Sequence, residues 1–278
     1  MRIAPSAEDL IEITSAWEGP RGADGRPHVD DEVLATIRQA STEQAWHVLR
    51  LHGYDRQFAG GWQQTHPGTV LAGRAVTAQF VPHRPDLDAA VVKAGARQGH
   101  LEGDRQNSWV ISLLGPGDVM VVDIFGKVVE GTVVGDNLGT AVAARSGVGA
   151  VIDGGVRDLQ GLVELPGVNF FVRGVDPTPI RNVTLAGVNL PIRIGPATVL
   201  PGDVVLGTPS GVIFIPAHLA GEVAETSRDI QLRDRFGKLR LAEGVYSSAE
   251  IDVPEWAAEI EADFTTWLAS TRAAPDDR

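Results

Sequence analysis

The chain has 278 residues, of which 43% are hydrophobic and 22% are charged, enough for a substantial core. Its formal net charge of −12 argues against a nucleic-acid-binding protein, because phosphate backbones require a basic surface. The absence of cysteine excludes disulfides, thiolate catalysis and zinc–thiolate sites. The first residues, MRIAPSAEDLIEI, lack the basic start and long apolar run of a signal peptide, and no segment approaches the ~18 apolar residues of a membrane span. We therefore expect a cytoplasmic protein without membrane contact.

Residues 1–68 are predicted to be helical. Ser6, followed by Asp9, approximates a capping box that would start a first helix. A second helix is predicted to begin near Asp30 or Asp31 and to continue through the segment VDDEVLATIRQASTEQAWHVLRLHG. One apolar face is expected for it, formed by Val33, Ile37, Ala40 and Ala45.

Residues 69–216 contain short apolar runs separated by glycine and proline, which is typical of strands in a compact α/β core. Two Pro-Gly-Asp turns, at 116–118 and 201–203, each precede a strand; proline presets such a turn and the aspartate bonds its own backbone. We predict structural roles for both aspartates. His83 is the one histidine that we expect to contribute to a pocket, whereas Asp86 and Asp88 are interpreted as loop acids.

The segment GDNLGTAVAARSGVGAVIDGGVRD, residues 135–158, is the main candidate for chemistry. It predicts a turn, a helix over 139–145 and a strand over 148–153. Such a unit would bring Asp136 close to Arg157 and Asp158, at a strand end where α/β proteins usually bind ligands. A carboxylate there can hold a divalent metal, and a guanidinium can grip a substrate carboxylate. The alternative is a surface turn with a local salt bridge, but the glycines crowding both ends of the strand favour a site.

Residues 217–278 are predicted to return to helix and to end in a polar tail. The last helix carries an aromatic and aliphatic stripe that must be buried, on its own core or on a neighbouring subunit: Trp256, Ile260, Phe264 and Trp267. We divide the chain into a helical N-terminal extension (1–68), a catalytic core (69–245) and a C-terminal helix with its tail (246–278).

The segments PGDVMVVDIFGKVVEGTVVGDNLGTA, GAVIDGGVRDL and VLPGDVVLGTPSGVIFIP resemble the RraA-like family over roughly residues 70–245. That family includes the regulator of ribonuclease E activity and the class II pyruvate aldolases acting on 4-hydroxy-4-methyl-2-oxoglutarate and 4-carboxy-4-hydroxy-2-oxoadipate. An aspartate followed, after twenty residues, by Arg–Asp is the signature of its aldolase-type members. The resemblance implies an α/β fold with a layered β/β/α core of the swivelling-domain type, here with helical N- and C-terminal extensions.

Residue by residue, the resemblance implies that Asp158 is the protein ligand of Mg²⁺ or Mn²⁺, with waters in most other positions. Arg157 would hold the 2-oxo acid and steady the enolate. Asp136 would lie beside the ion and bond one of its waters, which could act as the base that removes the 4-hydroxyl proton, so Arg157 and Asp136 are the implied catalytic residues. Further substrate contacts are implied for the backbone amides of Asn137, Leu138 and Gly139 and for Asn107. A carboxylate from a neighbouring subunit would complete the site, with Asp234, Asp229 and Glu225 as candidates.

The implied function is a metal-dependent lyase that cleaves a 4-hydroxy-2-oxo acid by a retro-aldol reaction and releases pyruvate. Oxaloacetate decarboxylation is expected as a side activity, because it passes through the same enolate. The resemblance also implies a homo-oligomer, a trimer or dimer of trimers, and we therefore favour a neighbouring subunit as the partner of the aromatic stripe. Two alternatives stay open: a regulatory protein that binds a ribonuclease, and a metal-dependent sugar-acid dehydratase using the same residues.

Overall fold

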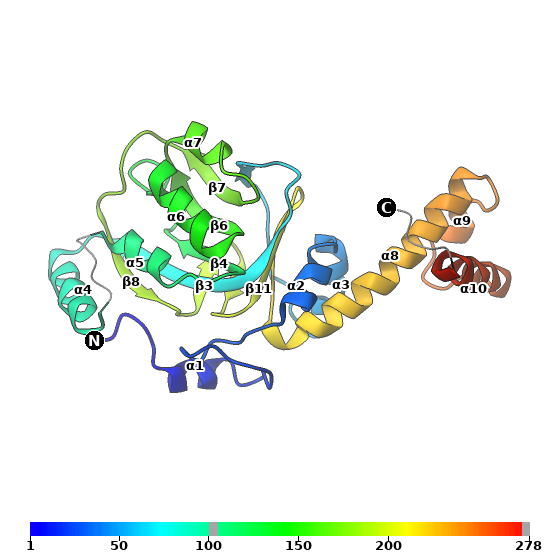
Figure 1. The fold of residues 1–278 in the computed structure, drawn as a ribbon, viewed down its shortest axis with the longest axis horizontal. Coiled ribbons are helices and arrows are strands. Elements are labelled where there is room, and N and C mark those ends of the chain that lie inside the picture. Colours follow the sequence, from blue (N-terminus) through cyan, green and yellow to red (C-terminus); the bar gives the residue numbers. More distant parts are fainter. Residues whose placement is uncertain (100–104, 274–278) are drawn as a thin grey trace. The chain divides into compact units, whose positions relative to one another are not determined.

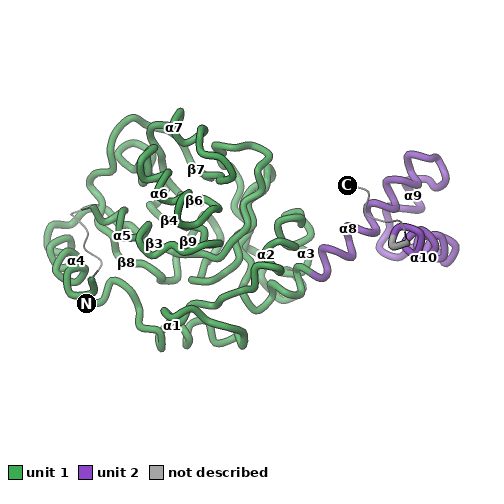
Figure 2. Tube along the Cα trace, in the orientation of Figure 1, with its two compact units in different colours: residues 1–224 green, residues 225–278 purple. Residues whose placement is uncertain are grey.

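The computed structural model describes residues 1–99 and 105–273, and the chain divides into two compact units, residues 1–224 and 225–278 (Figure 2). The predicted polar tail falls beyond residue 273 and lies outside the described residues. The division into an N-terminal extension, a catalytic core and a C-terminal helix, with boundaries after residues 68 and 245, remains a prediction.

The first unit holds strands and short helices, and helix α8 continues into the second unit (Figure 1). The helices of the first unit are α1 (Ala7–Ile13), α2 (Asp31–Ile37), α3 (Thr42–Leu51), α4 (Pro85–Arg97), α5 (Gln106–Ser112), α6 (Asp136–Ser146), α7 (Leu159–Val163) and the 3₁₀ turn η1 (Ala217–Leu219). Its strands are β1 (Phe58–Ala59), β2 (Gln63–Gln64), β3 (Leu71–Pro82), β4 (Asp118–Asp123), β5 (Thr132–Val134), β6 (Gly149–Val156), β7 (Asn169–Val175), β8 (Val183–Val188), β9 (Ile192–Ile194), β10 (Ala197–Val199), β11 (Val204–Thr208) and β12 (Gly211–Ile215). The remaining helices are α8 (Ala220–Ala242), α9 (Ser248–Ile251) and α10 (Ala258–Ala273). No helix within the described ranges is long and apolar enough to cross a membrane.

The main sheet has the strand order β1-β12-β11-β3-β4-β6-β7-β2, with β5 paired to β6 and β8 paired to β3. Its centre, β3-β4-β6-β7, is parallel, and the pairs toward both edges are antiparallel. Parallel strands are usually covered on both faces, and here side chains alternate between two cores. Met120 and Val122 face the helical layer of α4 to α7, while Val119 and Val121 face the β9–β10 hairpin. The predicted α/β fold with β/β/α layers is confirmed.

The N-terminal segment follows the prediction in part. Ser6 and Asp9 form the predicted capping box: Asp9 N donates to Ser6 Oγ at 3.2 Å, and Ser6 N donates to Asp9 Oδ2 at 2.8 Å. The second helix begins at Asp31 as predicted, but a single continuous helix is wrong. It ends at residue 37 because Ser41 and Gln44 form a second capping box, with both bonds at 3.1 Å, that starts a new helix.

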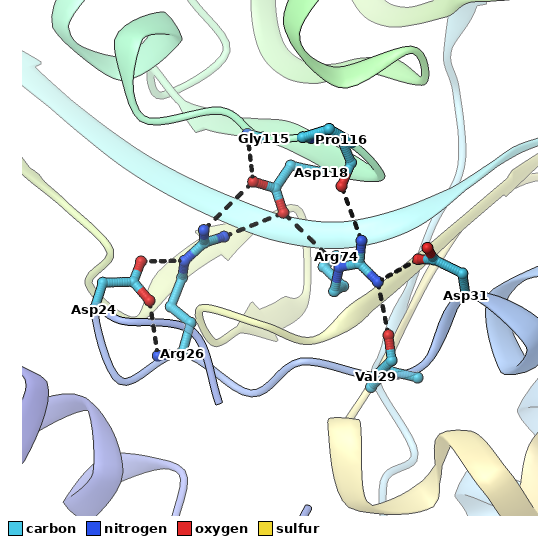
Figure 3. A network of polar contacts seen from close by, with 8 residues as sticks. All are labelled: Asp24, Arg26, Val29, Asp31, Arg74, Gly115, Pro116 and Asp118. Atoms are coloured by element: carbon cyan, nitrogen blue, oxygen red, sulfur yellow. Dashed lines mark hydrogen bonds and ion pairs between the residues drawn. The ribbon is translucent and has the colours of Figure 1, made fainter. Parts of the chain in front are cut away.

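The first Pro-Gly-Asp turn has the predicted structural role and also anchors the N-terminal extension (Figure 3). Gly115 N donates to Asp118 Oδ2 at 2.8 Å, closing the turn. The same carboxylate lies 3.3 Å from Arg26 Nη2 and 4.0 Å from Arg74 Nε. Arg74 is 3% exposed, and it also donates to Asp31 Oδ1 at 2.8 Å and to the Val29 carbonyl at 2.7 Å. Charge pairing in the interior therefore joins the segment before α2 to strands β3 and β4.

The second Pro-Gly-Asp turn places a carboxyl group in the interior with backbone partners. Leu200 N donates to Asp203 Oδ2 at 2.8 Å, and the Asp203 side chain is buried. Burial raises the pKa of Asp203 to about 7, despite the opposing effect of hydrogen bonds from the backbone of Leu200 and Ala217. An acid with a raised pKa in the folded state releases its proton more easily when the chain unfolds.

We predict that Asp203 makes the protein less stable as pH rises from about 4 to about 7, because over this range the folded state holds a proton that the unfolded state has lost. Each pKa unit corresponds to ~1.4 kcal/mol, so the full effect is on the order of 4 kcal/mol. Asp203→Asn keeps the shape but cannot ionise. Urea unfolding at pH 5 and pH 8 should show a smaller loss of stability in the variant than in the wild type; equal losses would contradict the prediction.

The second unit is a helical hairpin with an aromatic core of its own. The ring of Phe236, on α8, lies 5.4 Å from the rings of Trp256 and Phe264 and 5.7 Å from that of Trp267. Ile260 is buried in the same stripe. Of the two coverings that the sequence left open, packing within the same chain is therefore present, with α8 as the partner. Trp256, Phe264 and Trp267 remain half-buried, and the favoured covering by a neighbouring subunit stays a prediction.

Candidate active site

The segment from β5 to the end of β6 forms the predicted turn–helix–strand unit. Val134 of β5 pairs with Val156 of β6 in parallel, so the residues after the two strands emerge at the same edge of the sheet. Asp136 is the first residue of α6, earlier than the predicted start at 139, and Arg157 and Asp158 directly follow β6. A hydrogen bond of 3.0 Å from Arg157 N to Val134 O ties the two connections together.

Two glycines allow the candidate side chains to approach one another. A Cβ atom at Gly135 would lie 2.4 Å from Asp158 Oδ2 and 3.1 Å from Arg157 Cγ. A Cβ atom at Gly161 would lie 2.6 Å from Asp136 Cβ. A side chain at Gly161 would press on Asp136 Cβ, and one at Gly135 would push the Asp158 carboxylate aside, so both glycines leave the room that Asp136, Arg157 and Asp158 occupy.

Asp158 has a strained backbone and an accessible carboxylate. Its φ of 53° lies in the left-handed region, which costs roughly 1–2 kcal/mol for most residues with a Cβ atom. Arg157 Nη1 lies 3.3 Å from Asp158 Oδ2, and the two side chains are 39% and 40% exposed. An exposed pair of this kind contributes only about 0–1 kcal/mol, so a bound ligand can separate it at little cost. Strain of this kind often accompanies function.

A cavity of about 720 Å³ lies beside this unit, within the size range of small-molecule sites. Of the predicted site residues, Asn107, Leu138 and Arg157 line it. The wall does not include Asp136, Asn137, Gly139 or Asp158. Arg105 and Arg181 join Arg157 in the lining, so the cavity is locally cationic although the chain carries a net charge of −12. The local charge suits an anionic ligand.

The start of α6 offers fewer backbone donors than its position suggests. Asn137 N donates to Asp136 Oδ1 at 2.7 Å, and Gly139 N donates to Gly135 O at 2.8 Å. A substrate carboxylate could take the Asn137 amide only by displacing the Asp136 side chain. The substrate-binding role of the amides at 137, 138 and 139 stays a proposal.

Asn107 is fixed in the cavity wall. Its side chain is 5% exposed, and its Nδ2 donates to the Val133 carbonyl at 2.7 Å. This bond uses one of the amide donors and orients the rest of the side chain. Asn107 therefore has the rigid placement that a substrate-binding side chain needs.

The donor set fits a hard divalent cation that keeps most of its waters. Within the described residues there is no group of three or more His, Cys, Asp or Glu side chains that could hold a metal ion. Asp158 and Asp136 lie around the same pair of glycines, and Mg²⁺ and related ions accept one or two carboxylates with waters in the other positions. Asp234, Asp229 and Glu225 lie on α8 in the second unit, and their part in the site stays a proposal.

Other polar residues of the wall come from segments without a recognisable motif. His83 lines the cavity, as the sequence analysis expected. The interpretation of Asp86 and Asp88 as loop acids is wrong, because both lie in the first turn of α4. Asp88 lines the cavity, whereas Asp86 forms an exposed pair with Arg84 at 2.8 Å. Gln106 and Arg181 were missed. The only available signal for them was polarity next to apolar runs, which surface residues share.

We predict that Gly135→Ala disrupts the site without unfolding the protein. The new methyl group would displace the partly exposed Asp158 carboxylate, and a shift of this kind should weaken divalent-metal affinity by roughly 10–100-fold. Calorimetric titration with Mn²⁺ measures the loss. Gly221→Ala is the matched control, because a Cβ there meets nothing within 4 Å. Unchanged affinity in Gly135→Ala would remove Asp158 from any metal site.

Comparison with solved structures defines the class of protein. RraAS2 of Streptomyces coelicolor, described as an unusual member of the RNase ES inhibitor RraA protein family, matches with a TM-score of 0.64 and 26% identity, covering 77% of this chain and 100% of that one. An uncharacterized protein from Pseudomonas syringae pv. tomato matches with a TM-score of 0.68 and 23% identity, covering 85% and 98%, which supports the fold alone. The fold is that of an RraA-type α/β protein.

The chain belongs to the RraA-like family, because the family model described as "RraA-like: Aldolase/RraA" matches residues 29–214. The resemblance found in the sequence is confirmed. The family includes both aldolases and RraA-type proteins, so membership alone leaves the activity open.

The curated relatives are similar over part of their length. A "Putative 4-hydroxy-4-methyl-2-oxoglutarate aldolase" of Halalkalibacterium halodurans is 29% identical over 133 residues, 47% of this chain and 61% of that protein. Protein DlpA of Legionella pneumophila is 31% identical over 128 residues, 45% of this chain and 20% of that protein. The match therefore spans about three-fifths of the first relative and one-fifth of DlpA.

Proposed function

We propose that this chain is a divalent-metal-dependent lyase that cleaves a 4-hydroxy-2-oxo acid by a retro-aldol reaction and releases pyruvate. Decarboxylation of oxaloacetate would be its side activity. The observation that carries the proposal is the position of Arg157, which lines the cavity and lies 3.3 Å from the accessible carboxylate of Asp158. With both side chains at the edge of one cavity, the guanidinium can bind the carboxylate of a 2-oxo acid while the carboxylate binds a metal ion beside it.

Arg157 would bind the substrate carboxylate in two parallel hydrogen bonds, which fixes the orientation of the 2-oxo acid. Asp158 would hold Mg²⁺ or Mn²⁺, and Asp136 would accept a hydrogen bond from a water beside it. The bound ion would polarise the 2-oxo group as a Lewis acid. Asn107, held against Val133, would contact the substrate from the cavity wall. The cationic lining would favour an anionic substrate.

Pyruvate release tests the proposal. The wild-type protein is incubated with oxaloacetate and with 4-carboxy-4-hydroxy-2-oxoadipate, each with Mg²⁺ or Mn²⁺ and then with EDTA. Spontaneous and metal-catalysed decay of oxaloacetate is subtracted. Protein-dependent, EDTA-sensitive pyruvate supports the lyase. Metal binding without pyruvate from either substrate would favour the sugar-acid dehydratase.

The second candidate is a regulatory protein that binds a ribonuclease. The observation in its favour is the similarity to RraAS2, described as belonging to an RNase inhibitor family, which aligns over its whole length. Pulldown of a ribonuclease by the wild type and equally by Asp158→Asn, with no turnover by either protein, would support this function over the lyase. In both cases we propose a homo-oligomer, a trimer or a dimer of trimers, which light scattering would measure.

A further inference from the structure

A chain of hydrogen bonds runs along the wall of the cavity that contains Arg157. Its members come from three separate segments: the loop before α4 together with the start of that helix, the start of α5, and strand β8. His83, Asp88 and Gln106 line the cavity, and Thr184, which is fully buried, connects two of them. None of these residues belongs to the Asp136–Asp158 segment.

In the first hydrogen bonds of this chain, the chemical nature of each atom decides which one donates and which one accepts. Leu185 N–H can only donate, and it lies 2.6 Å from Gln106 Oε1. The amide of Gln106 is thereby oriented, and its Nε2 donates to Asp88 Oδ1 at 2.8 Å. Asp88 is therefore held in place by a side chain that is itself fixed to the backbone of β8.

The next bonds assign the tautomer of His83. An ionised carboxylate only accepts, so the Thr184 hydroxyl donates its hydrogen to Asp88 Oδ1, at 3.1 Å. The Thr184 oxygen must then accept from its other neighbour, His83 Nδ1, at 3.3 Å. A neutral His83 consequently carries its hydrogen on Nδ1 and its lone pair on Nε2.

Retro-aldol cleavage needs a group that takes a proton from the 4-hydroxyl and later gives one to carbon 3. Among the described residues that line the cavity, the ionisable side chains are His83, Asp88 and three arginines, Arg105, Arg157 and Arg181. Arginine stays protonated near neutral pH. Asp88 accepts hydrogen bonds from Gln106 Nε2 and Thr184 Oγ1 at its Oδ1, and its part in this chain is to hold those two side chains in place. Histidine is the side chain suited to move a proton in both directions near neutral pH.

We infer that His83 Nε2 is the proton carrier of this site, and that Thr184, Asp88 and Gln106 are the residues that position it; the inference rests on the proposed lyase function. His83 Nε2 takes the proton of the substrate 4-hydroxyl as the C3–C4 bond breaks. The electron pair of that bond remains on carbon 3 as the enolate of pyruvate, and carbon 4 becomes a carbonyl. The same proton then passes from Nε2 to carbon 3, so atoms and charge balance without a further reactant.

The test compares two reactions in His83→Gln. Oxaloacetate loses CO₂ without deprotonation of a hydroxyl group, and solvent can protonate the resulting enolate. Retro-aldol cleavage should fall by at least ~100-fold, whereas decarboxylation should fall by less than about tenfold. An equal fall in both reactions, or no fall in either, would overturn the inference while leaving the lyase intact. Absence of pyruvate from both substrates with the wild type would overturn the lyase and the proton-carrier role together.

The tautomer is measured separately on the metal-free protein. Imidazole ¹⁵N shifts at a pH where histidine is neutral should show His83 with its hydrogen on Nδ1; the resonance is assigned by its loss in His83→Gln. Thr184→Val should produce a mixture of tautomers and a slower retro-aldol reaction, and Thr184→Ser should restore both. A wild-type ring with its hydrogen on Nε2 would overturn the assignment, independently of any activity.

Discussion

Asp158→Asn is expected to abolish metal-dependent turnover while the protein stays folded. The substitution keeps the size of the side chain but removes the negative charge that would hold the cation, so metal affinity and catalysis should fall together. Asparagine tolerates the left-handed backbone at φ 53° about as well as aspartate, so the strained turn before α7 can form. We expect kcat/KM to fall by at least about 10³-fold, equivalent to ~4 kcal/mol of lost transition-state stabilisation.

The measurement pairs Mn²⁺ titration with pyruvate release and thermal unfolding. Asp86→Asn is the matched control, because Asp86 is exposed and pairs with Arg84 outside the turn–helix–strand unit. It should retain wild-type metal affinity and turnover. Near-full activity of Asp158→Asn with a substrate that the wild type cleaves would show that the metal ligand had been assigned to the wrong residue.

Local sequence was sufficient to predict the turn, the helix and the strand of the segment that carries Asp136, Arg157 and Asp158. The glycines, the small-residue helix and the apolar strand are short-range features, and parallel pairing of β5 with β6 brings the two ends together. Element ends were less well predicted: α6 begins at Asp136 because Gly135 can serve as its N-cap. Ser41 similarly restarts the helix that was expected to continue from α2.

The remaining wall of the cavity depends on contacts between distant segments. Thr184 and Asp88 are 96 residues apart, and the hydrogen bond between them exists only because β8 pairs with β3, just before α4. No local pattern distinguishes Asp88, which lines the cavity, from Asp86, which pairs with Arg84 in solvent. Phe236 could not be identified as a partner of the C-terminal stripe for the same reason, since it lies on a different helix.

Arg157→Ala is expected to lower kcat/KM by two to three orders of magnitude, about 3–4 kcal/mol, because orientation and charge stabilisation are lost together. Arg157 lines the cavity and its Nη1 lies 3.3 Å from Asp158 Oδ2, but its side chain is 39% exposed, so the fold should not depend on it. Arg157→Lys keeps the charge and loses the two-pronged geometry, and should fall between the alanine variant and the wild type.

The Arg157 variants also separate substrate binding from metal binding. Mn²⁺ affinity should not fall in Arg157→Ala, because no metal ligand has been lost and a positive charge beside Asp158 has been removed, whereas substrate turnover collapses. Arg145→Ala, near the end of α6 with its side chain on the Ser112 carbonyl, is the control that should leave both unchanged. Turnover in Arg157→Ala within threefold of the wild type would contradict a substrate-binding role, and the cationic wall formed by Arg105 and Arg181 would then have to bind the carboxylate instead.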